Sequence, residues 1–414
     1  MIMKFKTIIA ALLLIPILIK AQENPDKPAF GIKFTGFVKN DVFYDTRQTV
    51  DVREGHFLLY PQNIKEDVNK KDINASPNFN MLAIQTRLTG NITGPDAFGA
   101  KTSGVIEGAF FGNIESDING FRLRHAFVKL NWKKSELLAG QYWHPLFIAQ
   151  AFPEVISFNT GVPFQPFSRN PQLRFTYKLD NLCLSATTYA ERDFASNGPK
   201  GVSNIYMRNA GIPAANLLLT YAKGNYLFGA GGDYKVIVPE LETSKGYITN
   251  ESLGSLSATA FSKIKIKNTT WKLQAVLAQN AHDLTMLGGY AIKNTSYDTL
   301  TGLKEFTNYY TGSVWTELYT VSGKFTTGVF GGYTKNFGTD YNMLPGAAVY
   351  ARGSNIAYVY RVSPRFMVTQ EKTTIGLEIE YTTAGYGKVN SLGEFSDINE
   401  VSNIRALLSF IYKF

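Results

Sequence analysis

The stretch IRALLSFIYKF at 404–414 decides the fold class of this chain. Apolar and aromatic residues occupy every second position, at Ile404, Ala406, Leu408, Phe410, Tyr412 and Phe414. Alternation with a period of two is typical of a half-buried β-strand rather than of a helix. On its own the stretch would also fit an ordinary edge strand, so the remainder of the chain has to be compared with it.

The same period of two continues through the chain from Phe30 onward. In 171–179, for example, Leu173 and Phe175 alternate with polar residues such as Arg174. We count about 16 such segments. Their approximate spans are 30–46, 79–93, 101–115, 119–132, 135–143, 171–179, 181–192, 214–223, 225–237, 253–266, 269–283, 304–319, 322–337, 353–363, 366–383 and 401–414.

The connections between these segments alternate between short and long. Short turns are predicted at 133–134, 180–181, 224–225, 267–268 and 363–364, and long loops near 47–78, 144–170, 193–213, 238–252, 284–303, 338–352 and 384–400. This pattern is typical of outer-membrane barrels, which also have an even strand count. A soluble sandwich or propeller would use shorter strands. We therefore expect an all-β fold, a 16-stranded antiparallel transmembrane β-barrel.

The N-terminus has the features of an export signal. Lys4 and Lys6 precede an apolar run at 8–19, and Ala21 is a plausible cleavage position. The apolar run is too short for a spanning helix, which needs about 20 residues. We expect a signal peptide at 1–21 and a mature barrel at 22–414, located in the outer membrane after export through the periplasm.

Composition excludes several classes of protein. A single cysteine excludes an internal disulfide framework, and a formal net charge of +9 is too small to indicate nucleic-acid binding. The four histidines lie far apart and lack metal-ligand spacing: His56, His125, His144 and His282. We expect no catalytic residues, no metal, no cofactor and no enzymatic activity.

Charged residues on the polar faces are the candidate functional residues. Arg87 and Arg174 lie on the polar faces of their segments. In 121–132 the apolar residues Phe121, Leu123 and Phe127 define one face. That alternation would direct Arg122, Arg124, Val128 and Leu130 into the lumen and His125 outward.

The long connection at 144–170 is the candidate constriction. Its prolines would stiffen it, and its phenylalanines could pack against the inner wall. Arg169 lies at its end, Glu154 lies within it, and Glu107 lies on the third segment. We expect this loop to fold into the lumen, with Arg87, Arg122, Arg124, Arg169 and Arg174 forming a positive wall opposite Glu107 and Glu154.

Four short stretches resemble those of a known family. GQYW at 140–143, FPE at 152–154, SRNP at 168–171 and GFVKND at 36–41 resemble DcaP-like porins, and more distantly the general trimeric porins. The terminal Phe414 resembles the signature that the barrel-assembly machinery is thought to read. The resemblance implies a homotrimer, arginines at Arg87, Arg124 and Arg169 on the wall, and Glu154 as the loop acid.

We therefore expect an outer-membrane porin for passive diffusion of small hydrophilic solutes, mildly preferring anions, that contacts membrane lipid and lipopolysaccharide. The alternative is a non-conducting barrel that acts as an adhesin or docking surface through loops 47–78 and 193–213. A plugged receptor with 22 strands would need a longer chain.

Overall fold

The computed structural model describes residues 30–112, 117 and 119–414. The predicted signal peptide at 1–21 lies outside these described residues. Within the described part of the chain, no helix has the length and apolar character needed to cross a bilayer.

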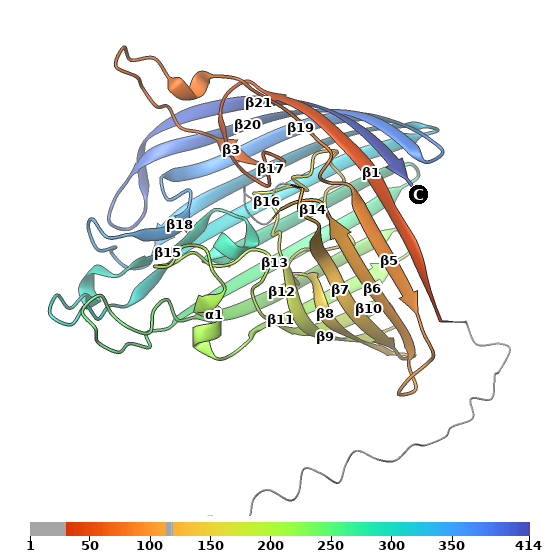
Figure 1. The fold of residues 1–414 in the computed structure, drawn as a ribbon, viewed down its shortest axis with the longest axis horizontal. Coiled ribbons are helices and arrows are strands. Elements are labelled where there is room, and N and C mark those ends of the chain that lie inside the picture. Colours follow the sequence, from red (N-terminus) through yellow and green to blue (C-terminus); the bar gives the residue numbers. More distant parts are fainter. Residues whose placement is uncertain (1–29, 113–116, 118) are drawn as a thin grey trace, which may run out of the picture.

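Sixteen antiparallel strands close into a barrel, shown from the side in Figure 1. The wall strands are β1 (Gly31–Asp45), β4 (Asn78–Leu82) with β5 (Arg87–Thr93) as one interrupted strand, β6 (Lys101–Ala109), β7 (Arg122–Asn131), β8 (Ser135–Trp143), β9 (Arg169–Leu179), β10 (Leu182–Tyr189), β11 (Ala214–Lys223), β12 (Tyr226–Ile237), β13 (Leu253–Ile266), β14 (Thr269–Gln279), β16 (Phe306–Ser322), β17 (Phe325–Thr339), β19 (Ile356–Gln370), β20 (Thr373–Val389) and β21 (Phe395–Lys413).

Smaller elements lie in the connections. They are β2 (Thr49–Val52), β3 (Phe57–Pro61), η1 (Ile73–Ala75), α1 (Ile205–Ala210), η2 (Ala281–Leu284), β15 (Gly288–Ile292), η3 (Asn294–Ser296) and β18 (Val349–Arg352). Strands β15 and β18 pair with each other, and β15 also pairs with β16, so together they extend the sheet.

The alternating sequence produces an apolar outer surface. Along β11, Leu217 and Leu219 are 60% and 49% exposed, whereas Asn216, the residue before Leu217, is buried on the lumenal side. In hydrocarbon this orientation is favourable, because lipid meets apolar side chains while closure pairs the backbone groups of the wall.

Pairing of the first and last strands closes the barrel. Strand β1 pairs with β21, from Phe37 opposite Lys413 to Asp45 opposite Arg405, and on its other edge with β4 and β5. The C-terminal strand predicted from 404–414 is thus confirmed. Its apolar face points outward as expected, since Phe410 and Phe414 are both exposed.

The two ends of the barrel differ. Short turns lie at the end that holds the C-terminus, and the long connections gather at the opposite end, on the left of Figure 1. The wall is also uneven in height, because β5 to β10 have 7–11 residues whereas β16, β17 and β19 to β21 have 15–19. The prediction of a long loop at 384–400 was wrong, because β20 and β21 continue through most of this range.

The prediction of a turn at 363–364 was also wrong. Ser363 and Pro364 lie inside β19, and the turn comes later, at Glu371 and Lys372. Pro364 stays paired with Val329 of β17, but the ladder to β20 is interrupted at residues 363 and 364. The interruption follows from the chemistry of proline, which has no N–H to donate to a neighbouring strand.

A β-bulge in β7 changes the predicted orientations there. The register between β6 and β7 shifts where Glu107 is opposite His125 and Gly108 is opposite Leu123. Arg124 and His125 are therefore both buried on the inside. Beyond the bulge the alternation is reversed, so Val128 is exposed on the outer surface rather than lumenal as predicted.

The barrel interior is partly filled. The connection at 144–168 folds inward, as expected, and places Phe147, Phe158 and Phe164 in a buried aromatic cluster. The first connection also enters the barrel, because Phe57 and Leu59 of β3 belong to the same cluster. We refer to the short strands β5 to β10 as the low wall.

Candidate functional site

The inward loop at 144–168 crosses the lumen and is fixed to the opposite wall. Lys39 Nζ of β1 donates a hydrogen bond to the Ile156 carbonyl at 2.6 Å. The Glu378 carboxylate of β20 accepts the backbone N–H groups of Ile156 and Ser157 at 2.6 and 2.8 Å. Charge-assisted bonds of this kind are short and strong, so the middle of the loop has a defined position.

Further contacts hold the loop on either side of Ile156 and Ser157. Lys272 Nζ on β14 lies 2.7 Å from the Glu154 carboxylate, and Arg361 on β19 donates to the Val162 carbonyl at 2.9 Å. Burial opposes ionisation of Glu154, but Lys272 lowers its pKa below the usual range. Glu154 therefore stays negative and bound to Lys272, beside β14 and β16.

The β2–β3 hairpin lies inside the barrel against this loop. Leu58 N donates to Asn159 Oδ1 at 2.8 Å, and Arg361 also donates to the Leu58 carbonyl at 2.7 Å. Sequence reasoning missed this second inward segment. Its signal was the apolar run FLLY at 57–60, which is unusual for a solvated loop.

The remaining space on the low side of the barrel contains a cavity of about 460 Å³. Its polar lining includes Arg87, Glu107, Arg124 and His125. Its apolar lining consists mainly of aromatic residues from β8 and the inward loop, including Tyr142, Trp143, Phe147, Phe152, Phe158 and Phe167. A wall with charged groups on one side and aromatic rings on the other suits passage of a polar solute.

Glu107 is shared by two arginines of the same wall. Its Oε1 lies 2.8 Å from Arg124 Nε and 3.6 Å from Arg87 Nε, and His125 Nε2 is 3.9 Å away. Glu107 therefore lies among the arginines. The sequence-based prediction, which put Glu107 opposite the arginines, was wrong. The neighbouring antiparallel strands β5, β6 and β7 bring these three residues together.

A second carboxylate, Asp193, is shared in the same way. Arg169 Nη2 lies 2.7 Å from Asp193 Oδ2, Arg53 Nη2 lies 3.2 Å from Oδ1, and Arg122 contacts the same oxygen. Burial would raise the pKa of Asp193, but the three arginines lower it below the ordinary range, with Arg169 contributing most. Sequence reasoning missed Asp193 and Arg53, because both lie in connections and are 140 residues apart along the chain.

The ring of Trp143 connects the two groups. The guanidinium carbons of Arg124 and Arg169 lie 5.8 and 5.3 Å from its centroid. Arg174 lies at the edge of this arrangement, donating to the Trp143 carbonyl at 3.1 Å. The predicted arginines thus lie along one wall, and we refer to Arg87, Arg122, Arg124, Arg169 and Arg174 as the arginine row.

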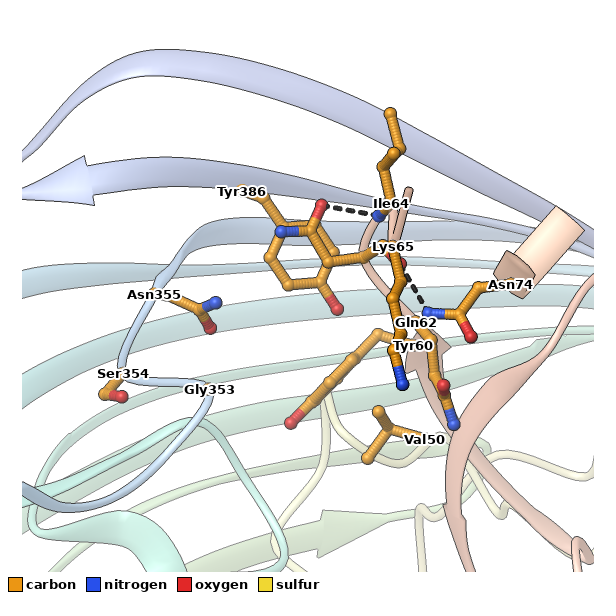
Figure 2. Close-up of a pocket in the computed structure, with 11 residues that line it drawn as sticks. Val50, Tyr60, Gln62, Ile64, Lys65, Asn74, Gly353, Ser354, Asn355 and Tyr386 are labelled. Atoms are coloured by element: carbon orange, nitrogen blue, oxygen red, sulfur yellow. Dashed lines mark hydrogen bonds between the residues drawn. The ribbon is translucent and has the colours of Figure 1, made fainter. Parts of the chain in front are cut away.

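Another pocket, of about 400 Å³, lies at the end of the barrel with the long connections (Figure 2). Figure 2 shows Ser354 and Asn355 of the β18–β19 turn on one side, facing Tyr60, Gln62 and Asn74 of the first connection. Lys65 is the one charged residue of its lining. Within the described residues, no group of histidine, cysteine, aspartate or glutamate has an arrangement suited to a metal ion.

These features define a class of protein. A closed barrel with an apolar outer belt and a third connection folded into a charged lumen is a transmembrane β-barrel of the porin type.

Comparison with solved structures agrees with this class. The outer-membrane channel DcaP of Acinetobacter baumannii matches with a TM-score of 0.68 at 18% identity, covering 93% of this chain and 98% of that one. The anion-selective porin of Comamonas acidovorans matches at 0.56 and 9% identity, covering 93% and 100%. OmpF of Salmonella typhi matches at 0.52 and 12% identity, covering 92% and 97%.

These likenesses show the fold, and they confirm at that level the porin resemblance inferred from 36–41 and 140–171. The sequence matches no protein-family model. It also matches no curated protein.

Proposed function

We propose that this chain is an outer-membrane porin through which small hydrophilic solutes diffuse passively, with a mild preference for anions, and that it is not an enzyme. One observation carries the proposal. The arginine row lines the low wall, in a lumen narrowed by the loop at 144–168. Focused positive charge in a narrow pore raises the local concentration of anions.

The number of charges supports the anion preference. Glu107 is shared by Arg87 and Arg124, and Asp193 is shared by Arg53, Arg122 and Arg169. Because each of these carboxylates faces more than one guanidinium, the low wall keeps an excess of positive charge. The transverse field between this wall and Glu154 would orient polar solutes and disfavour apolar ones.

Export and assembly complete the proposal. A signal peptide at 1–21 would direct the chain to the periplasm, and the barrel would then insert among outer-membrane lipid and lipopolysaccharide. A homotrimer is supported by the resemblance to trimeric porins. The outer face of the low wall, where Ile106 and Val128 are exposed, is apolar enough to pack against neighbouring copies.

Planar-bilayer recording of the purified protein tests the function. We expect steady conductance steps, in threes for a trimer, and a reversal potential in a salt gradient that shows anion preference. Strong cation preference would contradict the charge assignment but not the pore. Absence of steps from protein verified as folded would favour the alternative of an adhesin or docking surface, with the pocket in Figure 2 as a starting point.

A further inference from the structure

Arg53, Arg122, Arg169 and Asp193 form a compact group, which we call the mouth cluster. Its members come from four places in the chain: Arg53 from the β2–β3 turn, Arg122 and Arg169 from the first residues of β7 and β9, and Asp193 from the connection after β10. Beyond the ion pairs given above, Arg169 Nε donates to Asp193 Oδ2 at 2.8 Å. One carboxylate thus receives guanidinium groups from three directions.

The cluster is buried but has unused donors. The side chain of Asp193 is 2% exposed, and those of Arg169 and Arg122 are 3% and 13% exposed. Among the described residues, the Nη1 atoms of Arg122 and Arg169 have no hydrogen-bond acceptor. Arg53 has a further acceptor in the Gly112 carbonyl at 3.2 Å, but within the described part of the chain Asp193 leaves one Nη1 on each of Arg122 and Arg169 unpaired, and buried donors without acceptors are costly. The donor set therefore exceeds what Asp193 alone requires.

A cavity of about 500 Å³ adjoins the cluster. Its lining includes Arg53, Arg122 and Asp193, together with the exposed Arg192. Gln141 adds a polar side chain, and Phe121 and Leu123 complete the lining. This volume lies within the range of small-molecule sites, and three of the lining residues are arginines that can approach a single anion.

We propose that the mouth cluster is a binding site for the phosphate group of a solute, and that Asp193 occupies it as an internal substitute when no solute is bound. A phosphate has more acceptor oxygens and up to one more negative charge than a carboxylate, so it matches the guanidinium forks better. Because Asp193 belongs to the chain, it competes at high effective concentration and keeps the affinity low. Weak binding of this kind would let a solute enter the pore and leave it.

Asp193 can be displaced without unfolding the wall, since it lies in a connection. Its backbone N–H bonds to the Arg169 carbonyl at 3.3 Å, and the neighbouring Phe194 packs beneath Arg53 at 5.0 Å. The inference extends the proposed function by adding a solute class and a competing internal ligand. It rests on that function only in assuming that solutes reach the cluster from outside.

Equilibrium binding of inorganic phosphate to the folded, detergent-solubilised protein tests the inference independently of conductance. We expect millimolar binding by isothermal titration calorimetry, with no binding of chloride at equal ionic strength. Asp193→Asn removes the competitor and should tighten phosphate binding about tenfold. Asp180→Asn makes the same chemical change in the turn between β9 and β10 and should leave binding unchanged.

A second variant tests the inference even if Asp193→Asn fails to fold. Arg192→Gln changes an exposed side chain and should weaken phosphate binding severalfold while the barrel stays folded. If neither variant changes phosphate affinity, the inference is overturned. Binding of lipopolysaccharide but not of inorganic phosphate would assign the cluster to a membrane headgroup and would overturn it as a solute site.

The two proposals can fail separately. A conducting protein that binds no phosphate would retain the pore and refute the mouth cluster as a site. Phosphate binding by a folded protein without conductance would support the site and refute the pore.

Discussion

At the scale of single residues, the position of a charge matters more than its presence in the sequence. Arg124 is 1% exposed, and its Nε donates to Glu107 while its guanidinium lies against Trp143. An arginine held this way presents a fixed charge to the adjoining cavity. Lys267, in the turn between β13 and β14, carries the same charge at the surface, away from the lumen.

We predict that Arg124→Ala reduces the anion-to-cation permeability ratio about twofold, because Glu107 would keep only Arg87 as a close arginine partner. Reversal potentials in a salt gradient measure this ratio. Lys267→Ala removes an equal charge outside the pore and should leave the ratio unchanged. Equal ratios for Arg124→Ala and the unmodified protein would place Arg124 outside the permeation path.

Glu191, in the connection after β10, is expected to make that connection sensitive to pH. Burial and the nearby Asp283 raise the pKa of Glu191 to about 7, although Lys235 lies 3.8 Å away. Lys235 contacts Asp283 more closely, so it compensates Glu191 only in part. Ser196 donates to both oxygens of Glu191, at 2.8 and 3.0 Å.

An acid with a raised folded-state pKa is protonated when folded and ionised when unfolded over the interval between the two values. Stability of the connection should therefore fall as pH rises from about 4.5 to about 7, and then level off. We predict severalfold faster hydrogen exchange in 190–213 at pH 8 than at pH 5, after correction for intrinsic rates. Glu191→Gln should abolish that difference, and its persistence in the variant would exclude Glu191 as the cause.

At the scale of elements, local departures from strict alternation determine what faces the lumen. The bulge in β7 adds His125 to the lumenal side next to Arg124. The proline in β19 costs one hydrogen bond without bending the strand out of the wall. In both cases pairing with the neighbouring strands keeps the segment in the wall, although the local sequence favours a different orientation in β7 and a turn in β19.

We predict that Pro364→Val stabilises the barrel by about 0.5–1.5 kcal/mol, because valine restores an N–H that can pair with β20. The side chain faces outward, so valine meets no packing constraint inside. Thermal unfolding followed by heat-modifiable gel migration measures the change. Pro95→Val, in the β5–β6 connection, is the matched control and should not stabilise. A destabilised Pro364→Val variant would contradict this account of the interruption.

At the scale of the whole molecule, a buried ion pair links the first and last wall strands where they close the barrel. Arg405 on β21 contacts the Asp45 carboxylate on β1 at 2.7 Å, and both side chains are at most 2% exposed. Arg405 also donates to the Gly55 carbonyl at 2.9 Å, so the pair connects the first connection to the barrel as well.

We predict that Arg405→Met destabilises the closed barrel by about 3–5 kcal/mol, because Asp45 would remain buried without its partner. Urea-induced unfolding in micelles measures this loss. The double variant Asp45→Asn with Arg405→Met removes both charges and should recover most of the stability. A single variant as stable as the unmodified protein would show that closure does not depend on the pair.

The sequence alone determined the barrel. Period-two alternation, turn chemistry and the terminal strand depend on neighbouring residues, so the strand number followed from them. The inward loop, predicted at 144–170, followed instead from the length of that connection and from its prolines and phenylalanines. Alternation also put Arg87, Arg122, Arg124 and Arg174 on lumenal faces, and the family resemblance added Arg169 to that wall. Local reasoning failed at His125 and Pro364, where pairing with adjacent strands overrode the local pattern.

Only the tertiary structure decided how the lumen is filled and which charges meet. The β2–β3 hairpin enters the barrel because the aromatic loop and Arg361 provide partners for it, and those partners are about 100 and 300 residues away along the chain. Asp193 likewise meets Arg53, which lies 140 residues earlier in the chain. Contacts between distant segments arise from closure of the whole wall, and no local pattern in the sequence encodes them.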